Sequence, residues 1–411
     1  MPKTNNIPEV RFAGFTDAWE QRKLSELATM HARIGWQNLR TSEFLDSGDY
    51  MLITGTDFND GAINYSTCHF VERERYEQDK HIQIKNGSIL ITKDGTLGKV
   101  AYVQGLSMPA TLNAGVFNVE IRDETEVDNK YLFQYLKAPF LMDYVDKKAT
   151  GGTIKHLNQN ILVDFPVLLP SKAEQKAIGV YFERLDNLIT LHQRKYERLK
   201  NVKKSMLEKM FPKNGSNIPE IRFAGFTDAW EQRKLSDLII EYKETVDSDC
   251  TLPVLTSSKT EGVVLQEEHF GRVQNHDITG YNILPRNYCT YRNRSDGVDF
   301  TFNINRCCDK GIISKFYPVF YGNNSDIFFI SMVLNYCDEV VHEIAYTCTG
   351  TGQKVLSFLD LQKMNIRVPS YDEQKKISQY FEQLDNLITL HQRKLEKLQN
   401  IKKSMLEKMF V

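Results

Sequence analysis

Apolar residues recur at alternating steps of three and four in two long stretches of the chain. From Phe182 onward in the first stretch, and from Phe381 onward in the second, neither Pro nor Gly interrupts the pattern. This spacing is typical of a helix that presents a coiled-coil seam, and it predicts long helices over 174–211 and 373–411. The seam residues are Phe182, Leu185, Ile189, Tyr196, Leu199 and Met206 in the first helix, and Phe381, Leu384, Ile388, Leu395, Leu398 and Met405 in the second.

His192 and Lys203 occupy two steps of the same pattern, and two interpretations of them are open. They flank the seam, on an apolar face that Leu188 and Leu191 broaden, or they are buried in it and fix its register. A helix of about 30 residues spans roughly 45 Å, which is long enough to hold two domains apart.

The segments that precede these helices contain both strand-like and helix-like patterns. Short apolar runs separated by Gly, Asn and Asp predict strands at 88–92, 100–103, 311–314 and 327–330, and a longer amphipathic pattern predicts a helix over 129–145. The expected fold class is therefore α+β.

Two segments of the sequence occur twice. Residues 7–27 return as 218–238, with only Val10 replaced by Ile221 and Glu26 by Asp237. Residues 174–211 return as 373–410 with 30 of 38 positions identical. The segments between the repeats differ almost throughout, so we expect one fold that carries two different surfaces.

The repeats divide the chain into six parts and predict a pseudo-twofold internal repeat. These are a first constant segment (1–27), a first α/β domain (28–173), a helix (174–211), a linker with the second constant segment (212–238), a second α/β domain (239–372) and a final helix (373–411).

Charge restricts the function classes. The formal net charge is -1, which excludes binding to nucleic acid through bulk positive charge. The helical segments carry +4 and +3, whereas 28–173 and 239–372 carry -3 and -5. Seven cysteines without a C-x-x-C pair favour a reducing, cytoplasmic location. No apolar run reaches the roughly 18 residues of a membrane helix.

Local clusters of polar residues are the candidates for contact with DNA bases, because Arg and Lys pair with guanine and Asn and Gln with adenine. Ordinary surface positions are the alternative for each residue, and Trp36 could equally belong to a core. The candidates are Arg33, Trp36, Gln37, Asn38, Arg40, Lys93, Thr96, Lys99 and Lys155 in the first domain, and Arg286, Arg292, Arg294, Lys315 and Lys354 in the second.

The sequence contains little that indicates a catalytic site. The Gly-rich stretches 94–99 and 349–354 do not fit the phosphate-loop pattern, and close packing of Gly turns explains them better. The His and Cys residues show no metal-ligand spacing, and adjacent Cys307 and Cys308 are expected to be buried thiols. We therefore expect no catalytic and no metal-binding residues.

Taken together, the repeated segment from Phe12 to Leu24, the stretches 89–99 and 349–354, and the doubled helix resemble the specificity subunit of a Type I restriction-modification enzyme. The resemblance covers essentially the whole chain. It implies two target recognition domains, at 28–173 and 239–372, that each recognise one half of a bipartite site in double-stranded DNA. It also implies that the two helices pair antiparallel and set the spacer between the half-sites.

The same resemblance implies partners and cofactors. Two methyltransferase subunits would dock on the helices, and two restriction subunits would act as translocase and nuclease. S-adenosylmethionine, ATP and Mg²⁺ would belong to those partners, with no cofactor in this chain. The alternative function is a coiled-coil scaffold that presents two protein-interaction modules without DNA; a fused nuclease or methyltransferase ranks third.

Overall fold

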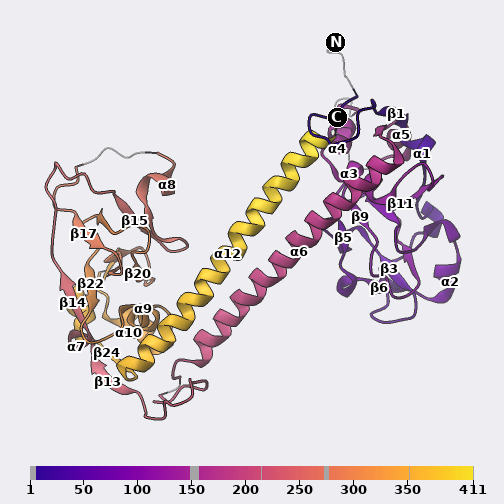
Figure 1. The fold of residues 1–411 in the computed structure, drawn as a ribbon. Helices are drawn as coiled ribbons and strands as arrows, with labels where there is room; N and C mark the ends of the chain where they lie inside the picture. The colour runs from indigo at the N-terminus through magenta and orange to yellow at the C-terminus, as the bar shows by residue number, and fades with distance from the viewer. Residues whose placement is uncertain (1–5, 149–156, 214, 273–276, 351, 411) are drawn as a thin grey trace. The chain divides into compact units, whose positions relative to one another are not determined.

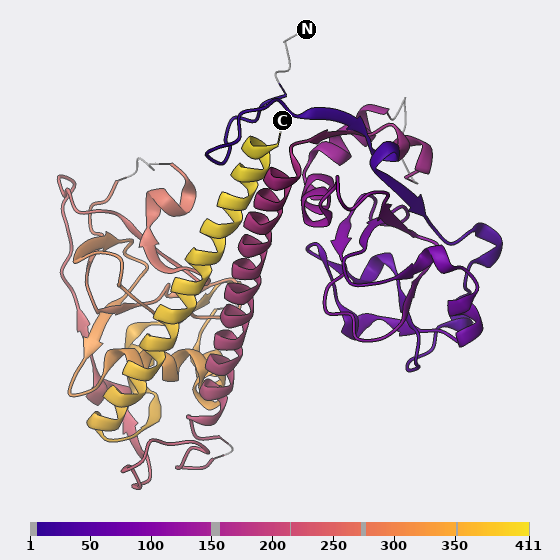
Figure 2. The same cartoon turned by 45° about the vertical axis from the view of Figure 1, so that its right-hand side comes forward.

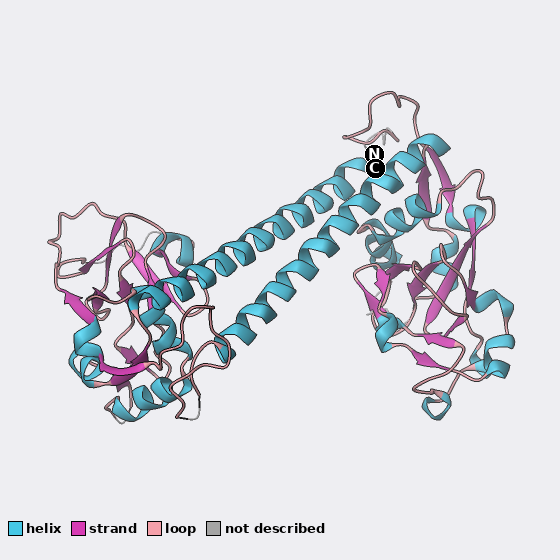
Figure 3. Cartoon of the chain, turned by 60° about the horizontal axis from the view of Figure 1, so that its bottom comes forward, coloured by secondary structure: helices cyan, strands magenta, loops and turns pink. Residues whose placement is uncertain are grey.

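The chain forms two compact units. The computed structural model describes residues 6–148, 157–213, 215–272, 277–350 and 352–410, without the Trp36 side chain. Unit 1 comprises Met1–Gln193 and Arg393–Val411, and unit 2 comprises Arg194–Gln392. Both units mix helices with strands, which confirms the predicted α+β class (Figure 3).

Two uninterrupted helices, α6 (Lys172–Lys209) and α12 (Tyr371–Met409), each contribute to both units (Figure 1). Each begins two residues before its predicted start, because a Pro-Ser pair caps it. The hydroxyl of Ser171 accepts a hydrogen bond from Glu174 N (3.4 Å), and that of Ser370 accepts one from Glu373 N (3.5 Å). Each helix ends two residues before the predicted boundary.

Unit 1 contains two four-stranded sheets. One has the order β6-β3-β10-β7 and the other β2-β11-β8-β9, and β4 and β5 form a separate hairpin. The strands are β1 (Glu20–Lys23), β2 (Ala28–His31), β3 (Met51–Ile53), β4 (Phe58–Asn59), β5 (Ala62–Ile63), β6 (His69–Phe70), β7 (Gln83–Ile84), β8 (Ile89–Thr92), β9 (Val100–Tyr102), β10 (Ala110–Leu112), β11 (Val116–Ile121) and β12 (Pro166–Leu169). The helices are α1 (Leu24–Leu27), α2 (Arg73–Glu77), α3 (Asn129–Lys137), α4 (Phe140–Lys148) and α5 (Gln159–Val163), with 3-10 turns η1 (Gly35–Gln37), η2 (Thr41–Glu43), η3 (Gly55–Asp57), η4 (Tyr65–Thr67) and η5 (Lys80–Ile82).

Unit 2 has one four-stranded sheet, β14-β22-β18-β20, and four two-stranded pairings, which are β13-β24, β15-β16, β17-β21 and β19-β23. Its strands are β13 (Glu231–Lys234), β14 (Ile239–Tyr242), β15 (Leu255–Ser258), β16 (Gly262–Leu265), β17 (Asn282–Pro285), β18 (Cys289–Thr290), β19 (Arg294–Ser295), β20 (Asn303–Ile304), β21 (Lys310–Ile313), β22 (Val319–Gly322), β23 (Lys354–Val355) and β24 (Asn365–Val368). Its helices are α7 (Leu235–Leu238), α8 (Gln266–Phe270), α9 (Ile327–Tyr336), α10 (Asp338–Thr347) and α11 (Phe358–Lys363).

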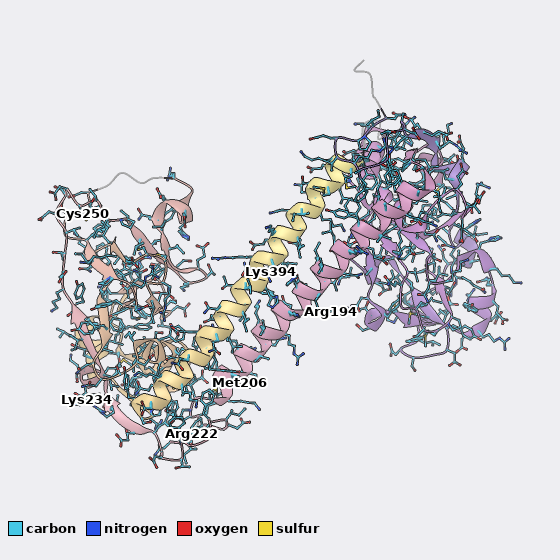
Figure 4. All side chains as sticks on the ribbon, in the orientation of Figure 1. Arg194, Met206, Arg222, Lys234, Cys250 and Lys394 are labelled. Atoms are coloured by element: carbon cyan, nitrogen blue, oxygen red, sulfur yellow. The ribbon has the colours of Figure 1, made fainter. Side chains whose placement is uncertain are left out.

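The repeated N-terminal segment holds the start of the long helix in each unit. β1 pairs antiparallel with β12, the strand before α6, and β13 pairs in the same way with β24, the strand before α12. Arg11 donates two hydrogen bonds to the buried carboxylate of Glu174, at 2.6 and 2.8 Å. Arg222, which Figure 4 labels, makes the same pair of bonds to Glu373, at 2.6 and 2.7 Å.

The end of each long helix lies in the core of the unit that the other half of the sequence builds. In unit 1, the Phe410 ring stacks on Phe182, with centroids 5.7 Å apart, and lies edge-on to Trp19 at 6.5 Å. In unit 2, Phe211 stacks on Phe329 at 5.9 Å and lies edge-on to Trp230 at 6.0 Å. In Figures 1 and 2 the last turns of α12 accordingly lie beside the first turns of α6.

Two sequence-based element assignments are wrong. The helix expected over 129–145 is broken into α3 and α4, because Pro139 follows Ala138 and cannot continue the hydrogen-bond pattern of α3. The strand expected at 327–330 is the start of α9, where Asp326 caps the helix by accepting a hydrogen bond from Phe329 N at 2.9 Å. This short helix is apolar on most of its surface because it is largely buried, so its sequence lacks a helical period.

The other predicted strands are confirmed as β8, β9 and β21. The expectation of two adjacent buried thiols is wrong, since Cys307 is exposed and Cys308 is half-buried. Among the described residues, no helix combines the length and the apolar character needed to cross a membrane.

Replacing Phe410 by Ala is expected to destabilise unit 1 by about 3–5 kcal/mol, because the substitution leaves a cavity among Phe182, Trp19 and Tyr131. Urea unfolding followed by tryptophan fluorescence measures the change. Leu188→Ala, at a position 44% exposed on α6, is the control and should shift the free energy of unfolding by no more than about 0.5 kcal/mol. Equal effects of the two substitutions would contradict a structural role for the helix end.

Candidate nucleic-acid interface

A Gly-rich turn between β8 and β9 presents the first group of candidates. Thr92 closes the turn, accepting hydrogen bonds from Gly98 N to its carbonyl and from Lys99 N to its hydroxyl, both at 2.9 Å. Gly95 and Gly98 have φ angles of 73° and 69°, in the left-handed region that favours glycine. The turn therefore exposes Thr96 and Lys99. Lys93 is half-buried, with its ammonium 5.7 Å from the centre of the Phe117 ring.

Arg33 does not belong to a DNA-contacting surface, and the structure corrects that prediction. It is 1% exposed, and its guanidinium donates to the carbonyl of Leu112 (3.0 Å), the amide oxygen of Gln78 (3.1 Å) and the hydroxyl of Thr111 (3.3 Å). Burial lowers the pKa of Arg33. Four of the five N–H donors of this buried arginine bond inside the domain, so Arg33 ties β2 to β10 and to the end of α2.

The neighbours of Arg33 divide between core and surface. Gln37 is 5% exposed, which also corrects its assignment as a DNA contact, whereas Asn38 and Arg40 are exposed. The side chain of Trp36 and the whole of Lys155 lie outside the described residues. The backbone N–H of Arg40 and the guanidinium of Arg75 hold the pKa of the Glu43 carboxyl below its usual value. Arg75 and Glu43 are both half-buried, and the sequence context of Arg75 did not indicate this pair.

In unit 2, the candidates Arg292 and Arg294 line one polar cavity of about 270 Å³, together with residues from more distant parts of the sequence. Its lining residues are Ser257, Lys259, Arg292, Arg294, Ser295, Asp296, Gly297, Asp299, Thr301 and Tyr317. Within the described residues, neither Arg292 nor Arg294 has a carboxylate partner, whereas Lys259 pairs with Asp299 at 3.1 Å. In the described structure the two guanidinium groups of the cavity therefore make no ion pair, although the carboxylate of Asp296 also lines it.

Lys354 and Lys315 lie close to Arg294. The pairing of β19 with β23 places Arg294 opposite Val355 and Ser295 opposite Lys354. The Phe316 ring lies under the Arg294 guanidinium, 4.6 Å from its centre, and under the Lys315 ammonium at 5.9 Å. Four of the five predicted residues of this domain are thus brought together by tertiary structure.

Arg286 is the fifth and does not join them. Its guanidinium pairs with Asp309 at 2.7 Å and donates to the carbonyl of Arg306 at 2.8 Å. Sequence reasoning also missed Lys259 and Tyr317. Lys259 comes from the hairpin of β15 and β16, more than 30 residues before Arg292, and no local pattern connects the two.

The seam residues of the long helices are buried or half-buried throughout, and two lysines of the seam pattern, Lys203 and its equivalent Lys402, pair with the other helix. In unit 1, Lys402 is 8% exposed and pairs with Asp186; in unit 2, Lys203 pairs with Asp385 at 2.5 Å. These are equivalent pairs, 199 positions apart. Burial is the largest influence on Lys402 and lowers its pKa. The buried interpretation describes Lys402, the equivalent of Lys203, whereas Lys203 itself is half-buried, with a side chain that is 24% exposed. His192 is also half-buried, and both interpretations of it stay open. Together with the stacking of Phe410 on Phe182, the order of contacts shows that the helix segments of unit 1 run antiparallel.

Each helix also exposes two leucines at equivalent positions. Leu188 and Leu191 on α6 are 44% and 46% exposed, and Leu387 and Leu390 on α12 are 43% and 45% exposed. These exposed pairs, called here the leucine patches, flank the seam. One patch belongs to each unit.

The chain matches the family described as Type I restriction modification DNA specificity domain over residues 16–201 and 310–400, more than half of its length. The chain therefore belongs to this family of specificity subunits. It is 24% identical to the putative type I restriction enzyme MjaX specificity subunit of Methanocaldococcus jannaschii, covering 98% of this chain and 95% of that protein. It is 23% identical to the MjaVIII specificity subunit of the same organism, covering 94% and 95%.

A solved structure supports the fold. The crystal structure of the Type-I restriction-modification system S subunit from M. genitalium matches 98% of this chain and 99% of its own, with a TM-score of 0.64 and 14% identity. The expected family and fold class are confirmed.

Replacing Arg33 by Ala is expected to lower the stability of the isolated chain by about 2–5 kcal/mol, because the Thr111 hydroxyl and the Leu112 carbonyl lose a buried donor. Chemical denaturation measures the loss. The control is Lys99→Ala, at an exposed position of the same domain, and it should leave the free energy of unfolding nearly unchanged. If Arg33→Ala folds with unchanged stability and instead loses DNA affinity, the structural assignment of Arg33 is wrong.

Proposed function

We propose that this chain is the DNA-recognition subunit of a Type I restriction-modification complex. Residues 28–173 and 239–372 are the two target recognition domains, and each recognises one half of a bipartite, asymmetric site in double-stranded DNA. Membership of the specificity family supports this function. The cavity of unit 2 is the structural observation that carries it, because two guanidinium groups without carboxylate partners lie in a polar recess.

The chemistry of that recess suits the edge of a base pair. A guanidinium can donate two parallel hydrogen bonds to O6 and N7 of guanine in the major groove. Arg292 and Arg294 are the residues that we assign to base recognition. Lys315 and Lys354 are assigned to the phosphates beside it, where a single flexible ammonium is sufficient. In unit 1, Thr96 and Lys99 on the β8–β9 turn take the corresponding role.

The long helices set the distance between the half-sites and dock the methyltransferase subunits. The equivalent pairs Lys402–Asp186 and Lys203–Asp385 favour one register of the helices over others, because a shift along the seam would separate both pairs and leave the buried charge of Lys402 unpaired. The two leucine patches have the same spacing in near-identical sequence, so one type of partner can bind both. If each patch binds one methyltransferase subunit, the complex contains two of them.

The chemical steps belong to partners in this proposal. The methyltransferase subunits bind S-adenosylmethionine and methylate adenine, and two restriction subunits use ATP and Mg²⁺. This chain is the non-catalytic member. A cytoplasmic location follows from its DNA target and agrees with seven free cysteines.

One experiment tests the recognition function directly. The chain is co-expressed with its candidate methyltransferase subunit, and methylated adenines are mapped on genomic DNA by single-molecule sequencing. We expect a bipartite motif with a fixed spacer that disappears when this chain is omitted. Methylation that does not depend on the chain would overturn the proposal in favour of a protein scaffold.

The variant Arg294→Ala sharpens the same experiment. We expect discrimination to fall by about 1–3 kcal/mol at one base pair of one half-site, while the other half-site is recognised normally. Arg286→Ala is the matched control, because that guanidinium is already paired with Asp309. Uniform loss of methylation at all sites would instead make Arg294 a phosphate contact.

Charged substitutions in the leucine patches test the docking of partners. Leu188→Asp with Leu191→Asp should remove one methyltransferase subunit from the complex, and Leu387→Asp with Leu390→Asp should remove the other. Burying a carboxylate in an apolar interface is strongly unfavourable. Light scattering of the purified complex measures its mass. Two bound subunits in both double variants would place the docking surface elsewhere.

A further inference from the structure

Two histidines and a glutamate from three separate elements of unit 1 come together on its surface. His31 ends β2, His81 lies in η5 and Glu120 lies in β11. One ligand atom from each lies within 4.8 Å of the other two. The imidazole rings of His31 and His81 are stacked, with centroids 4.6 Å apart and planes inclined by 21°. Nε2 of His31 is 4.0 Å from Oε2 of Glu120.

The backbone fixes the positions of all three residues. In the β2–β11 ladder His31 pairs with Asn118, so Glu120, two residues further on, lies on the same face as its diagonal neighbour. The main chain of His81 is held at both ends, since its N–H donates to Asp79 at 2.9 Å and its carbonyl accepts from the Asn118 side chain at 3.0 Å.

Arg33 provides a second constraint on the same region. It follows His31 by two residues and bonds to the carbonyl of Arg75 and the side chain of Gln78, just before η5. The buried arginine therefore holds the segment that carries His81 against the sheet that carries His31 and Glu120. The cluster is assembled before any ligand arrives, and only side-chain rotations remain free.

From this arrangement we propose that His31, His81 and Glu120 form a binding site for a divalent transition-metal ion, with zinc as the preferred ion. Two imidazoles and one carboxylate are a common set of three zinc ligands, and the fourth position is left for water. Zn–N bonds of about 2.0–2.1 Å place the ligand atoms of a tetrahedral site roughly 3.3 Å apart. The cluster must contract to reach that spacing.

The side chains of the cluster have room to move closer together. The side chain of Glu120 is 55% exposed and that of His31 30% exposed, so both can turn without displacing a core. Nε2 of His31 also lies 3.1 Å from the hydroxyl of Thr29, and an ion between His31 and Glu120 would replace this hydrogen bond. The site is independent of the proposed DNA-recognition function, and its failure would leave that function untouched.

The test uses the full chain and two ions. Zn²⁺ binding is measured by isothermal titration calorimetry, and Co²⁺ binding by visible absorption, because thiolate ligation by any of the seven free cysteines adds a charge-transfer band that an N₂O ligand set lacks. The variants are His31→Gln, His81→Gln and Glu120→Gln. Glu120→Gln changes an exposed side chain, and circular dichroism verifies that each variant is folded.

The control is His269→Gln in unit 2. His269 pairs with Glu261 through Nδ1 at 2.5 Å, and within the described residues no third ligand completes that pair. We expect one zinc ion per wild-type chain, unchanged affinity in His269→Gln, and at least about tenfold weaker binding in each of the three site variants, since even outer-shell changes cost that much. Absence of binding by the wild type, or equal affinity of wild type and Glu120→Gln, would overturn the proposal.

Discussion

The stability of each unit depends on an aromatic residue at the end of a long helix. Phe410 lies among Trp19, Tyr131 and Phe182, and Phe211 lies among Trp230, Phe329 and Phe381. In both cases the helix begins in one half of the sequence and ends in the core of the unit built mainly by the other half. Neither unit is complete without a contribution from both halves. Burial of large aromatic surface is what makes this exchange favourable.

Pairs of charged residues fix the register of the long helices, which aromatic burial alone would leave undetermined. The hydrophobic effect has no direction, so an apolar seam tolerates shifts along the helix. The pairs Lys402–Asp186 and Lys203–Asp385 resist such shifts, because a shift separates both pairs and moving the buried charge of Lys402 away from its partner is costly. The bidentate bonds from Arg11 to Glu174 and from Arg222 to Glu373 fix the N-terminal segments in the same way. One constant framework thus carries two dissimilar domains.

The candidate interface was predictable only in part. Arg292 and Arg294 form a usable local signal, since basic residues alternate with aromatic ones, and the structure places both in one cavity. The cluster around Arg33 gave an equally basic signal, yet Arg33 and Gln37 are buried and Arg33 bonds internally. Whether a guanidinium faces solvent or a carbonyl of another strand depends on residues nearly 80 positions away. The three elements that hold His31, His81 and Glu120 are likewise far apart in sequence, separated by 50 and 39 positions.

The sequence by itself determined the repeat, the long helices with their seam, and the family. Those features rest on local periodicity and on comparison of one segment with another, which need no knowledge of long-range contacts. Tertiary structure alone decided that Pro139 divides a helix, that the apolar run from Ile327 is helical, and which polar side chains meet. Burial and pairing are properties of the folded neighbourhood, and a linear pattern does not contain that neighbourhood.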